Sequence, residues 1–442
     1  MTSALTFDDG LPALVQLLLS GTKLDPKKDG YLLRDGFGRV AFVTGTPMPA
    51  AEIRRFNKAA SDALGKLAFP SGALQVSDSD LPEGSYIWRT WDFNDDTRMT
   101  LKVVDRRLIG RDWLTKPADP IPGLPPMLTF GSIKGGVGRT TALFVLAIYL
   151  SRLGKNVLVV DLDLEAPGLA SLLFADEGPP DYGALEYLVE TSLNGVADED
   201  LHRYVGRSLL TDRLAAKGRV DLLPATGMQT EYVPESMMAK LARALVERPS
   251  PTGPIPLSAQ LREMISRFAS NGEYDAILVD ARAGLAELTA GPLLGLGSNL
   301  LMFGTDHPHT FDGYRFLLAH LGLLAPSKNE AEWRDRLHFI HAKAPARVDR
   351  LQLFDDRMYD LLAEFLYDEF VDEVSDVFNF GVDDDSGPHR SWKIYHDAQF
   401  LDVDYLTDPA VVDSPIFEAV FSDFIAKALD LLAIEDPIKG LK

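Results

Sequence analysis

Apolar residues follow a clear pattern from residue 127 onward. Short apolar runs alternate there with longer stretches that carry apolar residues at helical spacing. This alternation is typical of a parallel sheet whose strands are joined by crossover helices. The predicted strands are Met127–Phe130, Asn156–Asp161, Val220–Leu223, Ala276–Asp280, Leu300–Phe303, Leu337–His341 and Trp392–Tyr395. The predicted helices are Thr140–Leu153, Gly183–Leu193, Ser236–Glu247, Ser258–Asn271, Thr310–Leu324 and one that begins at Ser414-Pro415. The predicted fold class is α/β, with a mostly parallel sheet that has helices on both faces.

The first 116 residues have a different pattern and predict a small α+β domain. Apolar residues at helical spacing indicate helices at Leu11–Leu19 and Ala50–Leu67. Strands are expected at Val40–Thr44 and Met99–Leu108. No set of residues in this part has the spacing of a catalytic site, so its role stays open.

A proline-rich stretch separates the two patterns. Pro117 to Pro126 contains five prolines, which neither a helix interior nor a central strand accommodates. We therefore predict three parts: a domain at 1–116, a semi-rigid linker at 117–126, and a second domain at 127–442.

Charge and composition narrow the classes of function. The chain has no cysteine, which excludes disulfides and thiolate metal sites, and its net charge is −21. Lysine and arginine balance aspartate and glutamate up to Pro126, so the second domain carries all the excess negative charge. Such a surface repels phosphate backbones, and nucleic-acid binding by that domain is not expected. Residues 98–116 hold six basic and two acidic residues, which indicates either a local nucleic-acid contact or a solvated edge strand.

The sequence shows no sign of membrane insertion or export. It has no uncharged apolar run of about 18 residues and no basic start followed by an apolar core. A cytoplasmic location is therefore expected.

The run from Lys134 to Thr141 has the composition of a phosphate-binding loop. It follows a predicted strand, contains three glycines and leads into a helix. Glycines let backbone N–H groups converge on an anion, and the start of the helix adds its dipole. Arg139 stands where such loops usually have lysine, and Thr140 has the position of the hydroxyl that binds Mg²⁺.

Carboxylates follow two of the predicted strands. Asp161 ends one strand and Asp163 comes just after it, while Asp280 ends another strand, four residues before Gly284. The carboxyl ends of strands in an open parallel sheet form the ligand crevice. These side chains should therefore lie near the glycine-rich loop.

Together these motifs resemble the MinD/ParA class of P-loop ATPases, also called SIMIBI proteins. Lys134–Thr141 resembles the deviant Walker A motif of that class, in its Lys-Gly-Gly-Val-Gly-Arg variant. Asp161-Leu162-Asp163 with Pro167-Gly168 resembles the first switch. Asp280 to Gly284 resembles the Walker B motif and second switch. The resemblance covers about 127–435.

The resemblance implies ATP and Mg²⁺ as cofactors and assigns roles to single residues. Lys134 would reach across a nucleotide-bound homodimer to the partner subunit's phosphates, and Asp163 would orient the attacking water. Thr140 would bind Mg²⁺ and Asp280 would hold it through water, with Asp161 beside its coordination shell. The remaining nucleotide-binding positions would be Gly135, Gly136, Val137, Gly138, Arg139 and Thr141. The class often reads adenine through an asparagine, but this chain has His341-Ala342-Lys343 at that place, which leaves adenine and guanine open.

The main functional hypothesis is a slowly hydrolysing ATPase switch that dimerises around nucleotide and regulates or recruits a protein partner. Members of this variant are bacterial, and many resemble regulatory or defence-associated proteins. One alternative is a nucleotide-binding scaffold that barely hydrolyses, because Arg139 displaces the γ-phosphate. Another is a DNA-partitioning ATPase, which the acidic second domain argues against.

Overall fold

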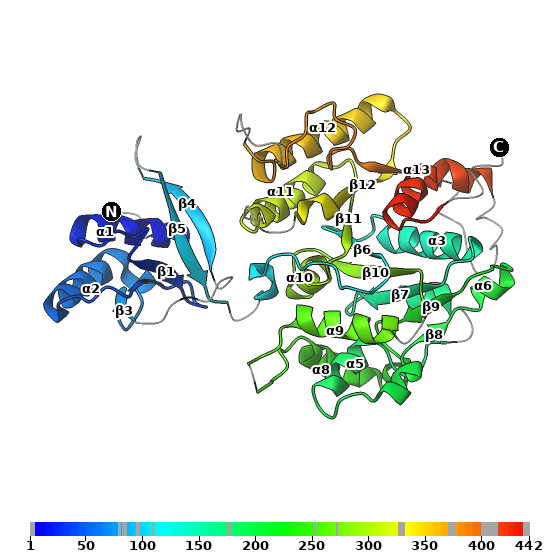
Figure 1. Cartoon of the computed structure of the whole chain (residues 1–442), viewed down its shortest axis with the longest axis horizontal. Helices are drawn as coiled ribbons and strands as arrows, with labels where there is room; N and C mark the ends of the chain where they lie inside the picture. Colours follow the sequence, from blue (N-terminus) through cyan, green and yellow to red (C-terminus); the bar gives the residue numbers. More distant parts are fainter. Residues whose placement is uncertain are drawn as a thin grey trace. The chain divides into compact units, whose positions relative to one another are not determined.

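Two separate sheets form where the sequence shows its two apolar patterns. In the computed structural model, the described residues are 5–77, 81, 86–93, 98–107, 110–174, 178–251, 253–270, 273–325, 332–369, 377–398 and 414–435. They belong to two compact units, Met1–Lys116 and Pro117–Lys442, each built around its own sheet (Figure 1).

The first unit is an α+β domain with a five-stranded mixed sheet in the order β3-β2-β1-β5-β4. Its strands are β1 Gly30–Arg34, β2 Val40–Thr44, β3 Leu74–Val76, β4 Ile87–Asp92 and β5 Arg98–Asp105. Its helices are α1 Gly10–Gly21 and α2 Ala50–Leu64. Apolar side chains from both helices and the sheet share one core, which includes Leu14, Phe56, Phe42 and Leu101. Both predicted helices form, but the predictions omitted β1, β3 and β4, and Leu108 lies outside the described residues.

The second unit has an eight-stranded sheet in the order β13-β12-β11-β6-β10-β7-β9-β8. Its strands are β6 Met127–Ser132, β7 Val157–Leu162, β8 Gly206–Arg207, β9 Val220–Leu223, β10 Ala276–Ala283, β11 Asn299–Gly304, β12 Leu337–Ala344 and β13 Trp392–Tyr395. Every neighbouring pair is parallel except β8 with β9. The predicted α/β class is confirmed.

Helices cover both faces of this sheet (Figure 1). They are α3 Arg139–Arg152, α4 Leu169–Leu173, α5 Ala184–Thr191, α6 Leu210–Arg213, α7 Met228–Tyr232, α8 Met237–Ala244, α9 Leu257–Ser270, α10 Glu287–Leu294, α11 Pro308–Gly322, α12 Val348–Phe365 and α13 Pro415–Leu431. One face packs against α3 and α13, and the other packs against α5, α9 and α10. The sequence predictions placed α3, α5, α8, α9, α11 and α13 within a few residues, but they omitted α10, α12 and the short helices α4, α6 and α7.

The proline-rich segment 117–126 belongs to the second unit. The Ala118 N–H donates to the Leu294 carbonyl at the end of α10 (2.7 Å), and Arg336 donates to the Ala118 carbonyl (2.9 Å). Arg262 donates to the carbonyl of Asp119 (2.7 Å). The segment is therefore a strap bonded to the second unit, and it reaches β6 as an ordered part of that unit.

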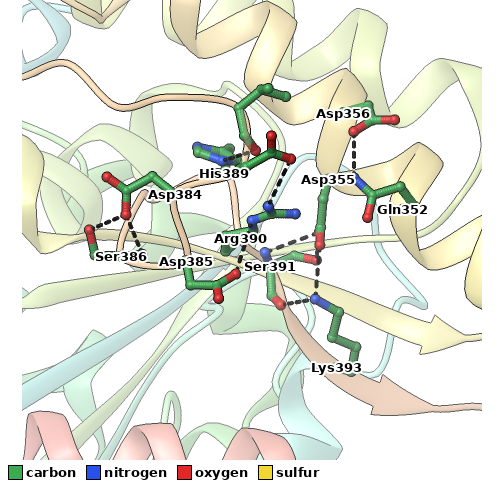
Figure 2. A network of polar contacts seen from close by, with 12 residues as sticks. Gln352, Asp355, Asp356, Asp384, Asp385, Ser386, His389, Arg390, Ser391 and Lys393 are labelled. Atoms are coloured by element: carbon green, nitrogen blue, oxygen red, sulfur yellow. Dashed lines mark hydrogen bonds and ion pairs between the residues drawn. The ribbon is translucent and has the colours of Figure 1, made fainter.

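The last strand, β13, is tied to α12 by a buried carboxylate. Asp355 of α12 accepts hydrogen bonds from the N–H and hydroxyl of Ser391 and from the Lys393 ammonium (3.0 Å), as Figure 2 shows. The Lys393 ammonium also donates to the Ser391 carbonyl (2.6 Å). These bonds fix β13, the edge strand of the sheet, to α12.

Among the described residues, no helix combines the length and the apolar character needed to cross a membrane.

Candidate functional site

The glycine-rich loop connects the end of β6 to the start of α3. Gly136 and Gly138 have φ angles of 74° and 91°, left-handed values that glycine adopts with little cost. A Cβ added at Gly135, Gly136 or Gly138 would meet no atom within 4 Å, so these residues border open space. Val137 is buried in the core and anchors the middle of the loop. The loop thus has the bent backbone and free surface of an anion cradle at a helix N-terminus.

Arg139, the first residue of α3, lies in the interior, where its guanidinium bonds to two carboxylates. Its Nε donates to Asp280 Oδ1 (2.5 Å), and its Nη2 donates to Asp163 Oδ2 (3.0 Å). A third, longer bond runs from Nη1 to the Ser132 hydroxyl (3.4 Å). The cation that the sequence led us to expect on phosphate therefore joins the ends of two strands.

Thr140 completes the hydrogen bonds of Asp280. The Thr140 hydroxyl donates to Asp280 Oδ2 (2.7 Å), so both oxygens of this carboxylate have partners. Burial raises the pKa of Asp280, and the charge of Arg139 opposes that rise. Thr140 and Asp280, predicted to act together, are in direct contact.

Asp163 keeps one oxygen without a partner. Its Oδ2 accepts from Arg139, while Oδ1 is buried and has no hydrogen bond within the part of the chain that the structure describes. A buried carboxylate oxygen without a donor is unfavourable, so it is a fitting acceptor for water or another ligand. The role of orienting the attacking water stays a prediction for Asp163.

Asp161 is fully buried, and its carboxylate serves the loop that follows β7. It accepts hydrogen bonds from the N–H groups of Asp163 (3.0 Å), Leu169 (3.3 Å) and Gly168 (3.4 Å). Burial and the nearby charge of Asp280 raise its pKa to about 7. Because its oxygens hold backbone amides, Asp161 shapes the loop in this conformation. Its place beside the Mg²⁺ coordination shell stays a prediction.

A second arginine joins the two loops that carry these carboxylates. Arg282, near the end of β10, forms an ion pair with Glu165, which lies in the loop after β7. Close by, the N–H of Gly284 (φ 101°) donates to the Ser132 carbonyl at the end of β6 (2.9 Å). The sequence placed both segments at one sheet edge but gave no sign of this pairing beyond the presence of the two opposite charges.

Two lysines lie at the glycine-rich loop in different ways. Lys134 is exposed and has no hydrogen bond or ion pair with any described residue. Lys343, at the end of β12, donates from its ammonium to the Gly136 carbonyl (2.8 Å). Lys343 was absent from the predicted site, and its only signal was a lysine two residues after the end of a predicted strand. Thr141, the other predicted contact in this region, is half-buried in the first turn of α3.

The donor set fits Mg²⁺ better than a metal that needs several protein ligands. Within the described ranges, no three histidine, aspartate or glutamate residues gather as a metal cluster. Mg²⁺ usually takes only one or two protein ligands and completes its shell with water and phosphate oxygens. The Thr140 hydroxyl and the Asp280 carboxylate could supply that contribution.

Comparison with known proteins shows which family of nucleotide-binding domains this part of the chain matches. Residues 128–324 match the family model described as the CobQ/CobB/MinD/ParA nucleotide binding domain. The segment 128–324 of the second unit therefore carries a nucleotide-binding domain of the MinD/ParA class, as the sequence motifs indicated.

Individual relatives are distant. The iron-sulfur cluster carrier protein of Salmonella typhimurium is 26% identical over 185 residues, which are 41% of this chain and 48% of that protein. A putative replication protein A of Rhizobium rhizogenes is 29% identical over 181 residues, 41% of this chain and 40% of its own length. The chain thus spans about half or less of the length of these curated relatives.

Solved structures of the class align over most of their own length. A complex of a Cyanothece McdA variant with ATP is 13% identical, with a TM-score of 0.43, and the match covers 71% of this chain and 98% of that one. The structure of pNOB8 ParA is 19% identical, with a TM-score of 0.41 and coverages of 70% and 99%.

Proposed function

We propose that the second unit is a Mg²⁺-dependent ATPase of low turnover, which dimerises around its nucleotide and thereby regulates or recruits a protein partner. The observation that carries this proposal is the contact of Arg139 with Asp280 and Asp163. It brings the loop, the metal-holding residues and the water-orienting residue into one connected site. Membership of the MinD/ParA class supports nucleotide binding and, with it, hydrolysis.

Each residue has a role in this proposal. The backbone N–H groups of Gly135–Gly138 and the first turn of α3, including Thr141, would bind the phosphates. The Thr140 hydroxyl and Asp280 would hold Mg²⁺, which neutralises phosphate charge when bound. The free oxygen of Asp163 would orient water, and Asp161 would keep the loop after β7 in shape. The exposed Lys134, which has no ion pair among the described residues, is available to reach the partner subunit's nucleotide.

Arg139 gives the reason to expect slow hydrolysis. Its planar guanidinium bonds to both carboxylates through separate nitrogen atoms, which a lysine ammonium cannot reproduce in the same geometry. Asp163 and Asp280 are therefore partly neutralised before nucleotide arrives. Their rearrangement would have to precede catalysis.

Molar mass in solution tests the dimerisation step. We expect wild type to be monomeric without nucleotide and with ADP, and dimeric with a non-hydrolysable ATP analogue and Mg²⁺. Lys134→Ala should bind the analogue yet remain monomeric, because this lysine would act only across the dimer. A wild-type monomer under every condition would contradict the switch mechanism.

Turnover at saturating ATP and Mg²⁺ separates the switch from the scaffold. Arg139→Lys should raise the rate by roughly tenfold, since release of a held catalytic group can change rates by that order or more. Asp163→Ala should remove the activity of both wild type and Arg139→Lys. If wild type, Arg139→Lys and Asp163→Ala all hydrolyse at the same background rate while binding ATP, the scaffold alternative is correct.

A further inference from the structure

Lys343 has a backbone conformation that lysine rarely adopts. Its φ angle is 51°, and only Ala215 and Ala433 share a positive φ among the described residues other than glycine. A left-handed residue with a Cβ costs about 1 kcal/mol, and such strain is concentrated at functional sites. The parallel pairing of β12 with β13 also shifts register between His341 and Ala344, so the strand is irregular at the position of Lys343.

The strained residue delivers an ammonium to the glycine-rich loop. Lys343 Nζ donates to the Gly136 carbonyl (2.8 Å), although β12 is separated from β6 by β11. A phosphate cradle needs its N–H groups free to face the anion, so its carbonyl oxygens must be held elsewhere. A cation on the carbonyl of the left-handed Gly136 meets that need, and it places positive charge beside the loop.

We propose that Lys343 is a positioning residue that holds the glycine-rich loop in its anion-binding shape before any ligand arrives. The bond links the loop to the β12–β13 edge, which is also fixed by the His396 N–H donating to the Ala344 carbonyl (2.9 Å). The part of this inference that concerns nucleotide affinity rests on the proposed function. The part that concerns the shape of the loop does not.

Hydrogen exchange of the full-length protein without nucleotide tests the loop directly. Lys343→Met removes the ammonium and keeps the strained backbone, while Lys343→Gly removes both. In each variant, backbone amides of the peptide that contains residues 134–138 should exchange at least about fivefold faster than in wild type. Lys343→Arg keeps a cationic donor and should restore part of the protection.

Two matched variants control for charge and for backbone strain. Lys217→Met removes an exposed lysine that precedes β9, at the opposite end of the strands, and should leave loop exchange unchanged. Ala215→Gly relieves a left-handed residue remote from the loop (φ 49°) and should also leave it unchanged. The thermal midpoint of Lys343→Gly should equal or exceed that of wild type, which separates loop positioning from loss of fold.

Measurement of nucleotide affinity is the second part of the test, after hydrogen exchange. The Kd values for ATP and for ADP, each with Mg²⁺, should rise together by about five- to tenfold in Lys343→Met and Lys343→Gly, because the loop contacts phosphates common to both. Faster loop exchange together with no nucleotide binding by wild type would sink the proposed function and leave the role of Lys343 standing. Loop exchange that is equal in wild type, Lys343→Met and Lys343→Gly would overturn the role of Lys343.

Discussion

At the scale of single residues, the positive charge at position 139 is spent on protein carboxylates, because the arginine side chain bonds to both Asp280 and Asp163. The guanidinium satisfies two strand-end carboxylates that would otherwise repel each other, and the side chain is almost fully buried. Removing one partner of such a buried pair usually costs several kcal/mol, since the remaining charge stays buried. Arg139 is thus both a structural tie and the residue that restrains the proposed chemistry.

Residue spacing predicted which side chains gather but not how they pair. Lys134–Thr141, Asp161, Asp163 and Asp280 could be placed at one sheet edge, because each follows or ends a parallel strand. The direction of the Arg139 guanidinium could not, since it depends on which of several nearby anions offers the better geometry. The bond from Lys343 to Gly136 joins residues 207 positions apart, a separation over which sequence pattern carries no information.

The buried side chain of His341 is expected to contribute a loss of stability on acidification. His341 is fully buried, stacks on Phe354 with ring centroids 4.1 Å apart, and has no hydrogen bond to any described residue. Burial lowers its pKa from the ordinary 6.5 to about 4. Below pH 6.5 the unfolded chain therefore binds a proton that the folded protein excludes. His341 should therefore lower the free energy of unfolding by about 2 kcal/mol between pH 7 and pH 5.

Urea unfolding of wild type and His341→Phe at both pH values measures this loss. Phenylalanine keeps a ring against Phe354 and cannot titrate, so its loss on acidification should be smaller by about 2 kcal/mol. Asp161 acts in the opposite sense in both proteins, because its raised pKa means that acidification from pH 7 relieves a buried charge. His202→Gln, which removes an exposed imidazole, should keep the wild-type difference. An unchanged difference in His341→Phe would contradict the assignment.

At the scale of elements, the site is made by the ends of β6, β7 and β10, which lie next to one another in the sheet. The strands of the second unit were well predicted because they are continuous apolar runs bounded by polar residues. Helix α12 was missed because acidic and basic residues interrupt its apolar positions. Its helical conformation is stabilised mainly by packing on β12, which the sequence pattern does not show. The short strands β1, β3 and β4 were missed because neighbours in the sheet, rather than their own pattern, hold them in place.

The ion pair between Glu165 and Arg282 should couple the loops after β7 and β10. Both side chains are about a third exposed, at 35% and 29%. Solvent screening therefore limits the pair to roughly 0.5–1 kcal/mol. Unfolding free energies of Glu165→Gln, Arg282→Gln and the double variant form the cycle that measures it. Additive effects would show that the two loops are independent.

At the scale of the whole molecule, the chain combines a unit of nearly balanced charge with a strongly acidic nucleotide-binding unit. The two have separate cores and separate sheets. The composition shift near residue 117 was visible in the sequence, whereas the bonds of the proline-rich strap were not. Prolines predict extended backbone, but they do not say whether that backbone is docked.

Two cores predict two thermal transitions in calorimetry of the full chain. Phe42→Ala, in the core of the first unit, should lower only one of them, because a fully buried phenylalanine is worth about 3–5 kcal/mol. Mg²⁺-ATP should raise only the other, by roughly 2.7 kcal/mol of stability at a hundredfold excess over Kd. A single transition that both changes shift would show that the units unfold together.

Helix α10 connects the candidate nucleotide site to the proline-rich strap over a short distance. Helix α10 begins three residues after Gly284 and spans eight residues, about 12 Å. Its last carbonyl, on Leu294, is the one that receives the N–H of Ala118, two positions beyond the point where the units divide. A tilt of α10 would act as a lever on the chain at its entry into the second unit. A movement of α10 would therefore be passed, through the bond between Leu294 and Ala118, to any domain attached ahead of residue 117.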